Sequence, residues 1–372
     1  MTNRADVAII GAGMAGASLA AEIAPHRSVI LIEAEAQPGY HSTGRSAAFW
    51  SETYGGPAIQ PLTTASGHFL AKPPPDFHDR SFLSPRGALT IAREDGLEML
   101  RAQQDVFLAQ GVTLEWLERQ ALQQRIAGLR PEWIAGLLEP NCSDIDVAAL
   151  HAAYLKSART FGTTVLTDAR VRALTRDAGR WRIHIAAGEV EAEIIVNAAG
   201  AWADEVAALA GVTPLGISPL RRTIAQLRVD PPAAADLPLV LDVGGLFYFK
   251  PEAGRLWLSP HDETASPACD VRPEELDIAE AIDRLQHVVD WTVEWVEHSW
   301  AGLRSFAPDR LPVYGFADAV EGFFWCAGQG GFGIQTAPAA AKLAASMLLG
   351  MAPDPMVAGI EAAIYSARRF MN

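Results

Sequence analysis

The sequence predicts an α/β fold organised around a dinucleotide-binding unit, and three observations carry this prediction. An apolar run at 6–16, "DVAIIGAGMAG", passes directly into a glycine-rich turn. A second apolar run, "SVILIE", ends in Glu33. Two later apolar segments, at 193–204 and from 322 onward, also break at glycines. Such strands, each opening into a turn and a helix, are typical of a Rossmann-like sheet that binds a nucleotide at one edge.

The first element is a strand, a turn and a helix with the glycine spacing of a dinucleotide site. Gly11 permits the tight turn, Gly13 lets the backbone approach a pyrophosphate, and Gly16 lets the helix and strand pack closely. Met14 and Ala15 follow at the start of the helix, where free N–H groups and a partial positive charge favour phosphate.

The second element ends in a carboxylate. Glu33 lies about 20 residues beyond the glycines, where an acid accepts hydrogen bonds from ribose hydroxyls and disfavours a 2'-phosphate. FAD or NAD is therefore expected rather than NADP. A structural glycine turn followed by an incidental acid is the alternative.

The later elements favour FAD over NAD. The segment "EIIVNAAGAWAD" at 193–204 is a buried strand that breaks at Gly200. From 322, "GFFWCAGQGGFGIQT" combines a strand with a glycine cluster and leads into a long helix of small residues. An NAD site is usually completed within one contiguous sheet. Elements scattered from end to end indicate a larger cofactor contacted by both ends of the chain.

Composition and charge exclude several classes of protein. The chain has 372 residues, of which 49% are hydrophobic and 20% charged, as in a globular protein of about two domains. A formal net charge of -14 argues against nucleic acid and anionic membrane surfaces as partners. Cys142, Cys269 and Cys326 are far apart and predict neither disulfides nor a metal site.

No transmembrane segment is expected. The stretch after Arg4 resembles a signal peptide, but its glycine spacing favours the nucleotide unit. The late apolar stretch "PAAAKLAASMLLGMA" is interrupted by Lys342 and is shorter than the about 20 residues that a membrane span needs. A soluble cytoplasmic protein is expected, and peripheral membrane association is left open.

Six motifs in order carry a resemblance to a known family. They are "AIIGAGMAGAS", "QPGYHSTGRSAA", "DIDVAALHAAYL", "VNAAGAWAD", "HSWAGLRSFAPD" and "EGFFWCAGQGGFGIQT". The chain resembles the FAD-dependent D-amino-acid oxidase and glycine oxidase superfamily, most closely its bacterial D-arginine dehydrogenase type. The resemblance implies an α/β (α+β) fold in which a Rossmann-like FAD-binding domain carries an inserted antiparallel-sheet substrate domain. The FAD-binding domain would comprise 1–83, 140–205 and 300–372, and the substrate domain 84–139 and 206–299.

The resemblance also implies a set of cofactor contacts. The "STGRSAA" loop would run beside the isoalloxazine ring, and the "GQGGFGIQT" glycines would lie at its pyrimidine end, where N–H donors and a helix dipole stabilise negative charge on the ring. Capping of the final helix is the alternative for Thr336. The implied residues, beyond Gly11, Gly13, Met14, Ala15, Gly16 and Glu33, are Ser42, Thr43, Arg45, Ser46, Ala47, Val171, Ala199, Gly200, Trp202, Gly302, Gly330, Gly331, Phe332, Gly333, Ile334, Gln335 and Thr336. No cysteine is placed for covalent attachment, so the FAD is expected to be non-covalent.

Amino-acid oxidation needs an anchor for the substrate carboxylate, and the expected catalytic residues are Arg222, Tyr248, Arg304 and Tyr54. A buried arginine requires a partner, and a bidentate carboxylate suits it. Pairing with protein carboxylates is the alternative, favoured for the neighbouring Arg221. For both tyrosines a place in the core is the ordinary expectation, and the resemblance overturns it.

The remaining chemistry needs no general base and no metal. Nearby arginines and exclusion of water lower the pKa of the substrate ammonium, so that a neutral amine supports hydride transfer from Cα to flavin N5. The imino acid then hydrolyses to a 2-oxo acid and ammonia. His41 in the flavin loop is interpreted as a satisfied loop histidine.

The chain departs from the D-arginine type at two places. Gly87 and Ala88 stand where the family carries an acid for the guanidinium, and Phe49 stands in place of a histidine. A D-amino acid with an apolar or small neutral side chain is therefore expected. Glu52 would receive a basic group only if its loop folded inward.

Two alternatives to a D-amino acid dehydrogenase stay open. One is a glycine or sarcosine-type amine oxidase that produces peroxide, and the other is a non-catalytic flavin-binding subunit. The sequence does not predict the electron acceptor, for which a quinone is one candidate. It does not predict the oligomeric state either.

Overall fold

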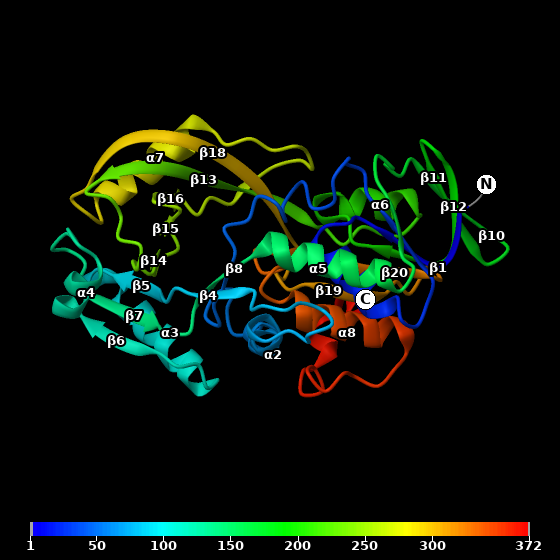
Figure 1. Ribbon diagram of the computed structural model, residues 1–372, viewed down its shortest axis with the longest axis horizontal. Helices are drawn as coiled ribbons and strands as arrows, with labels where there is room; N and C mark the ends of the chain where they lie inside the picture. Colours follow the sequence, from blue (N-terminus) through cyan, green and yellow to red (C-terminus); the bar gives the residue numbers. More distant parts are fainter. Residues whose placement is uncertain (1–2, 371–372) are drawn as a thin grey trace.

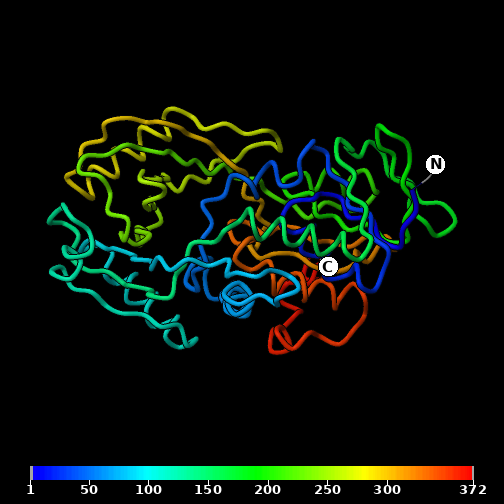
Figure 2. Tube along the Cα trace, in the orientation of Figure 1, coloured from blue at the N-terminus to red at the C-terminus, as the bar shows by residue number. Residues whose placement is uncertain are grey.

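A mainly parallel sheet and a mainly antiparallel sheet lie side by side in the computed structural model, which describes residues 3–370 (Figure 1). Both ends of the described chain lie in the half that contains the parallel sheet, as the tube in Figure 2 shows. This mixed architecture confirms the predicted fold class.

The parallel sheet is built on the predicted nucleotide unit. β1, β2, β9, β12 and β20 are parallel neighbours in the order β9-β2-β1-β12-β20, while β10, β11 and β19 extend the sheet with antiparallel pairs. The strands are β1 (Asn3–Ile10), β2 (Val29–Ile32), β9 (Thr164–Leu166), β10 (Ala173–Asp177), β11 (Arg180–Ile185), β12 (Gly188–Asn197), β19 (Val313–Phe316) and β20 (Phe323–Ala327). The "VNAAG" and "WCAGQGG" segments thus leave the sheet at its carboxyl edge, beside the first glycine turn.

Helices cover both faces of this sheet. The helices α1 (Met14–Ile23), α2 (Gln60–Ala71), α5 (Val147–Thr160) and α8 (Ala337–Leu349) share one apolar core on one face, and α6 (Ala203–Leu209) packs into a second core on the other face. Small side chains on α1 and α8 allow close helix packing. Gly350, at φ +64°, ends α8 in the left-handed conformation that glycine adopts without strain.

The antiparallel sheet forms the other half of the molecule. Its strands are β5 (Ala88–Ala92), β6 (Glu115–Glu118), β7 (Ala135–Glu139), β13 (Ser218–Asp230), β14 (Leu239–Asp242), β15 (Tyr248–Glu252), β16 (Arg255–Ser259), β17 (Thr264–Ala265), β18 (Thr292–Phe306) and β21 (Gln329–Gly330). The helices α3 (Leu97–Ala109), α4 (Arg119–Arg125) and α7 (Glu275–Gln286) accompany it. A small sheet of β3 (Phe49–Trp50), β4 (Leu83–Pro85) and β8 (Ser143–Ile145) adjoins both halves, and the short 3-10 helices are η1 (Glu94–Gly96), η2 (Gly200–Trp202), η3 (Ala362–Tyr365) and η4 (Ala367–Phe370).

The long β13 and β18 ribbon joins the two halves. These strands pair from Ser218↔Phe306 to Asp230↔Thr292, and the end of β18 also pairs with β21, next to the parallel sheet. The ribbon therefore carries side chains of the antiparallel sheet to the glycine-rich edge of the parallel one. We retain the two-domain division inferred from the sequence as a proposal, with β18 running across one of its boundaries.

Within residues 3–370, the helices are all too short or too polar to cross a bilayer.

Candidate active site

A cleft runs along the junction of the two halves and is lined from both ends of the chain. Most of the cofactor residues predicted from the sequence lie along it. These are Gly11, Gly13, Met14, Ala15, Glu33, Ser42, Thr43, Arg45, Ser46, Ala47, Val171, Ala199, Gly200, Trp202, Gly302, Gly330, Gly331, Gly333, Ile334 and Gln335. Gly16, Phe332 and Thr336 lie behind the lining. The structure thus brings together segments that are more than 300 residues apart in the chain.

The glycine turn closes the nucleotide end of the cleft. Gly11 has φ +103°, and a Cβ there would overlap the carbonyl oxygen of Ala198 and lie 2.8 Å from its carbon. Gly16 serves packing, because a Cβ there would overlap the Gly11 carbonyl oxygen. Both glycines are therefore required where β1, β12 and α1 converge.

Glu33 is positioned beside this turn. Its side chain is 9% exposed, and its carboxylate accepts hydrogen bonds from the backbone N–H groups of Ala12 at 2.9 Å and Glu35 at 3.0 Å. Beyond it, His41 Nε2 lies 3.0 Å from the Glu35 carboxylate, and both residues line the cleft with Arg170. The sequence analysis did not identify Glu35 or Arg170, because neither belongs to a motif.

Arg45 is held by protein groups. Its Nη1 donates to the carbonyl oxygens of Val271 at 3.1 Å and Ala301 at 3.2 Å, and Nη2 forms an ion pair with Asp270. Trp300 Nε1 in turn donates to the Arg45 carbonyl oxygen at 3.0 Å. The guanidinium therefore fastens the "STGRSAA" loop to β18 and to the segment before α7.

The glycine-rich segment before α8 carries two polar side chains with structural partners. The Gln335 amide accepts from Ser51 N–H at 3.1 Å and donates to the Tyr54 carbonyl oxygen at 3.0 Å. The Thr336 hydroxyl donates to the Phe332 carbonyl oxygen at 2.8 Å and makes no side-chain cap of α8. Thr336 therefore stands at the N-cap position of α8, as the capping alternative expects, but its side chain does not make the hydrogen bond of a cap. A contact from Gln335 to the cofactor would have to use its main chain.

Arg222 and Arg304 converge on the opposite end of the cleft, which we call the arginine end. Arg222 pairs with Gly302 across the ribbon and Leu220 pairs with Arg304, so both arginines project from the same face. Gly302 lies between them without a side chain, and a Cβ there would lie 3.5 Å from the Arg45 Cβ. The ribbon thus presents two guanidinium groups and leaves space next to them.

The two guanidinium groups are incompletely paired. Arg222 is 4% exposed; its Nε donates to the Asp262 carbonyl oxygen at 2.7 Å and its Nη2 to Glu263 at 3.2 Å. Among the residues that the structure describes, its buried Nη1 has no partner, and the same holds for the buried Nη1 of Arg304. Within residues 3–370 the Arg304 side chain has no ion-pair partner. Burial, and then the charge of Arg304, lower the pKa of Arg222.

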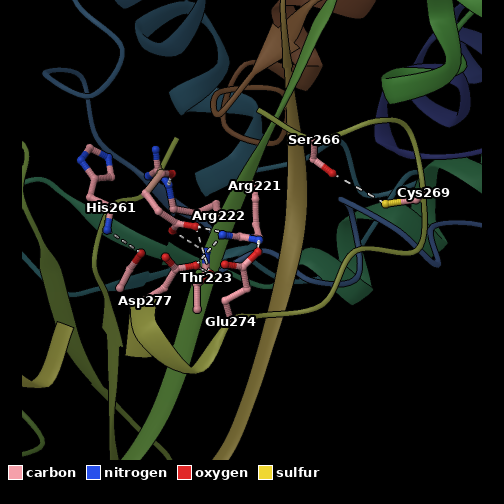
Figure 3. A network of polar contacts seen from close by, with 10 residues as sticks. Arg221, Arg222, Thr223, His261, Ser266, Cys269, Glu274 and Asp277 are labelled. Atoms are coloured by element: carbon pink, nitrogen blue, oxygen red, sulfur yellow. Dashed lines mark hydrogen bonds and ion pairs between the residues drawn. The ribbon is translucent and has the colours of Figure 1, made fainter. Parts of the chain in front are cut away.

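Arg221 points away from this cleft. It forms ion pairs with Glu274 and, at 2.8 Å, with Asp277 (Figure 3). Its Nε also lies 3.6 Å from the Asp262 carboxylate. This agrees with the structural role favoured for it from the sequence.

Two tyrosines stand near the arginines at different depths. Tyr54 lines the cleft, and its ring lies 4.9 Å from that of Phe49 and 5.6 Å from that of Phe332. Burial alone would raise the pKa of Tyr54, but the charges of Arg304 and Arg222 outweigh it and lower that pKa. Tyr248 is 2% exposed, its hydroxyl has no partner among the described residues, and it lies behind the lining, 6.3 Å from the Phe49 ring.

His261 is a neighbour that the sequence analysis missed. Its Nδ1 lies 2.7 Å from the Gly245 carbonyl oxygen, so this nitrogen carries the proton and donates. Its ring is 5.5 Å from that of Tyr248. Burial and the charge of Arg222 lower the pKa of His261 to about 3, which keeps the ring neutral. Only tertiary structure brings it here, so no local pattern identified it.

The walls at the arginine end are apolar. Phe49 is 7% exposed, lines the cleft and packs with Ala88, Ile224 and Tyr248. Glu52 is 8% exposed rather than solvent-exposed, and its carboxylate accepts from the Thr64 hydroxyl outside the cleft. Among the described residues, no carboxylate from β13, β18 or the 49–54 loop lines the cleft.

The residues present fit FAD. The glycine turn leaves room for a pyrophosphate against the backbone, Glu33 offers a carboxylate for ribose hydroxyls, and the cleft continues past the 42–47 loop and the glycine-rich 330–334 segment to the arginines. None of the three cysteines lines the cleft.

Comparisons with known proteins agree with this fit. The sequence is 24% identical over 360 residues to the glycine oxidase of Geobacillus kaustophilus (strain HTA426), covering 94% of each chain. It is 27% identical over 393 residues to mitochondrial dimethylglycine dehydrogenase of Rattus norvegicus, covering 93% of this chain and 43% of that protein.

Solved structures share the fold over nearly the whole length. The crystal structure of glycine oxidase from Geobacillus kaustophilus superposes with a TM-score of 0.83 at 23% identity, covering 97% of this chain and 99% of that one. L-proline dehydrogenase from P. horikoshii gives a TM-score of 0.84 at 19% identity, with 96% of each chain covered. The sequence model of the DAO family, described as "FAD dependent oxidoreductase", matches residues 6–347. The chain therefore belongs to the DAO family of FAD-dependent oxidoreductases.

Proposed function

We propose that this enzyme oxidatively deaminates a D-amino acid with an apolar or small neutral side chain to the 2-oxo acid and ammonia. The observation that carries the proposal is the pair of arginines at one end of the cofactor cleft, each with a buried Nη1 that has no partner within residues 3–370. Buried guanidinium donors require an acceptor. The carboxylate of an amino acid supplies two oxygens in the matching geometry.

We propose that Arg304 and Arg222 bind the substrate carboxylate and that Tyr54 donates a further hydrogen bond to it. Tyr248, with its unpartnered hydroxyl, would complete this anchor if a substrate group reached past Phe49. The two positive charges have a second effect. They disfavour the ammonium form of the substrate, and so does exclusion of water by the aromatic walls. The amine lone pair then becomes available to assist loss of hydride from Cα.

The cofactor would be held by the glycine turn, Glu33, the 42–47 loop and the 330–335 segment, as the sequence motifs predict. When bound, FAD supplies the acceptor for the hydride and its electron pair. The protein residues bind and orient the amino acid and keep water away from it. The imino acid product would hydrolyse without a dedicated catalytic group.

The side-chain preference follows from the walls of the cleft. Phe49 and Ile224 line the arginine end, and within residues 3–370 no carboxylate from the surrounding elements reaches the lining there. A lysine or arginine substrate would bury its cationic group without a partner, at a cost of several kcal/mol. An apolar side chain fills the same volume favourably. The D configuration is proposed from the motif resemblance to D-amino acid dehydrogenases.

A second candidate is an oxidase of glycine or an N-methylated glycine. The curated relative named glycine oxidase favours it, the relative named dimethylglycine dehydrogenase favours an N-methylated glycine as the substrate, and the same arginines would bind the carboxylate. The two candidates differ in the electron acceptor. An oxidase transfers the electrons to oxygen and releases peroxide, whereas we propose a quinone or another acceptor for the dehydrogenase.

The test is an anaerobic titration of the purified yellow protein with matched D- and L-amino acids, glycine and sarcosine. The flavin absorbance should bleach with D-isomers of apolar or small neutral residues. Bleaching by L-isomers alone would reject the D-amino acid proposal, and bleaching by glycine or sarcosine with aerobic peroxide release would establish the second candidate. A flavin that no amine or amino acid bleaches would indicate a non-catalytic subunit.

A further inference from the structure

Glu139, at the end of β7, is a buried carboxylate that the proposed chemistry does not use. It is 2% exposed, and no positively charged side chain within residues 3–370 pairs with it. One short loop surrounds it with donors. Oε1 accepts from Glu52 N–H at 2.6 Å, while Oε2 accepts from the hydroxyls of Ser51 at 2.8 Å and Thr53 at 2.7 Å and, at 3.4 Å, from Thr53 N–H.

The same loop is fastened from the opposite side. Gln335, just before α8, accepts from Ser51 N–H at 3.1 Å and donates to the Tyr54 carbonyl oxygen at 3.0 Å. Residues 51–54 are therefore clamped between β7 of the antiparallel sheet and the glycine-rich segment of the parallel half. Tyr54 ends the clamped loop, and its ring occupies the arginine end of the cleft between Phe49 and Phe332.

We infer that Glu139 is a positioning residue that places Tyr54 against the substrate carboxylate. The inference rests on the proposed function, because it takes Tyr54 as a substrate contact. A carboxylate in a folded protein is usually paired with a cation or exposed to water. Here the hydrogen bonds of its side chain are all made with residues 51–53, which directly precede Tyr54. Their loss would therefore first change the position of the Tyr54 side chain.

Glutamine is the sharpest substitution at this position. Glu139→Gln keeps the volume but replaces one acceptor oxygen with an NH₂ group, which would face the N–H and hydroxyl donors of the loop. At least one of the four hydrogen bonds must then be lost. The loop would shift, and the Tyr54 hydroxyl would lose its alignment with the two arginines.

A double-mutant cycle with Tyr54→Phe tests the coupling. Glu139→Gln alone should raise the KM for the best amino acid by up to about tenfold, and by no more than Tyr54→Phe does, with a smaller change in kcat. In the Tyr54→Phe background the same substitution should change KM by less than about twofold, because the hydroxyl that it positions is already gone. Equal effects in both backgrounds would overturn the inference and leave Glu139 a general stabilising residue. Glu115→Gln, an exposed site on the neighbouring β6, is the matched control.

A second measurement does not depend on catalysis. Amide hydrogen exchange of the peptide covering residues 49–60 should become at least about tenfold faster in Glu139→Gln than in wild type or Glu115→Gln. Unchanged exchange would overturn the clamp even if no amino acid reduced the flavin, whereas that lack of reduction alone would reject only the proposed function. If Glu139→Gln fails to fold, Thr53→Val can replace it, because it removes one hydroxyl donor to Glu139 from the loop. This variant should also raise KM and speed hydrogen exchange. No change in either measurement would overturn the inference.

Discussion

The two ends of the cleft present different kinds of groups to a ligand. The nucleotide end is lined largely by main chain and by positions without side chains, such as Gly11, together with the carboxylate of Glu33. The arginine end is lined by long side chains from distant elements, Arg222 on β13, Arg304 on β18 and Tyr54 on a clamped loop. A site made of backbone tolerates almost no added atoms, whereas a site made of side chains loses affinity in graded steps.

The largest effect is expected where an atom is added at the nucleotide end. Gly11→Ala combines a residue at φ +103° with a Cβ that would overlap the Ala198 carbonyl group. The turn between β1 and α1 would have to open, at a cost of about 3 kcal/mol or more. The protein should purify without bound FAD and melt at a lower temperature.

Gly254→Ala is the control that measures the cost of a positive φ without a steric overlap of the added Cβ. Gly254 also has a positive φ, +74°, but a Cβ there would meet nothing within 4 Å. It should cost only about 1 kcal/mol and keep the cofactor. If both variants lost the same stability and the same amount of FAD, the close approach of the Ala198 backbone to Gly11 would not explain the sensitivity of the nucleotide end.

A smaller, graded effect is expected at the arginine end. Arg304→Ala should keep the flavin and lower kcat/KM by about 10- to 150-fold, mainly through KM, because it removes a charge-assisted anchor worth about 1.5–3 kcal/mol. Steady-state kinetics with the best amino acid would measure this. Arg304→Lys should recover only part of the loss, since lysine cannot form the bidentate contact.

Arg228→Ala supplies the matched control on the same ribbon. Arg228 is exposed and pairs with Glu297, so its removal should leave KM unchanged. An Arg304→Ala enzyme with wild-type KM would assign that arginine to structure and remove the contrast between the two ends.

The same contrast explains what the sequence could predict. Gly11, Gly13 and Glu33 form a local pattern whose spacing follows from the geometry of a strand, a turn and a helix, so the fold class and the nucleotide end were predictable from the residues themselves. Arg222 and Arg304 lie more than 80 residues apart in sequence. Only the family resemblance singled them out, because their proximity depends on the register of β13 with β18.

Side-chain partners were the least predictable features. Arg45 was expected as a flavin neighbour, and it lines the cleft, but its guanidinium is occupied by Asp270, Val271 and Ala301. Glu139 and His261 lie near Tyr54 through tertiary contacts alone. A sequence pattern records periodicity and spacing, and these contacts leave no trace in either.

The smallest expected effect comes from ionisation of the Tyr54 hydroxyl at the arginine end. Arg304 and Arg222 lower the pKa of this phenol below its usual value of 10.0. Below that pKa the hydroxyl would donate to the substrate carboxylate in the proposed complex. Above it the phenolate accepts from the arginines and repels the carboxylate, so kcat/KM should fall as pH rises through the Tyr54 pKa.

Tyr54→Phe isolates this ionisation in a pH profile of kcat/KM. At neutral pH the variant should lose about 2- to 10-fold, the value of one hydrogen bond. It should keep the acidic limb, which reports deprotonation of the substrate amine, and it should lack the alkaline limb. An alkaline limb unchanged in Tyr54→Phe would assign the ionisation to another group. The two arginines would then bind the substrate carboxylate without competition from a Tyr54 phenolate.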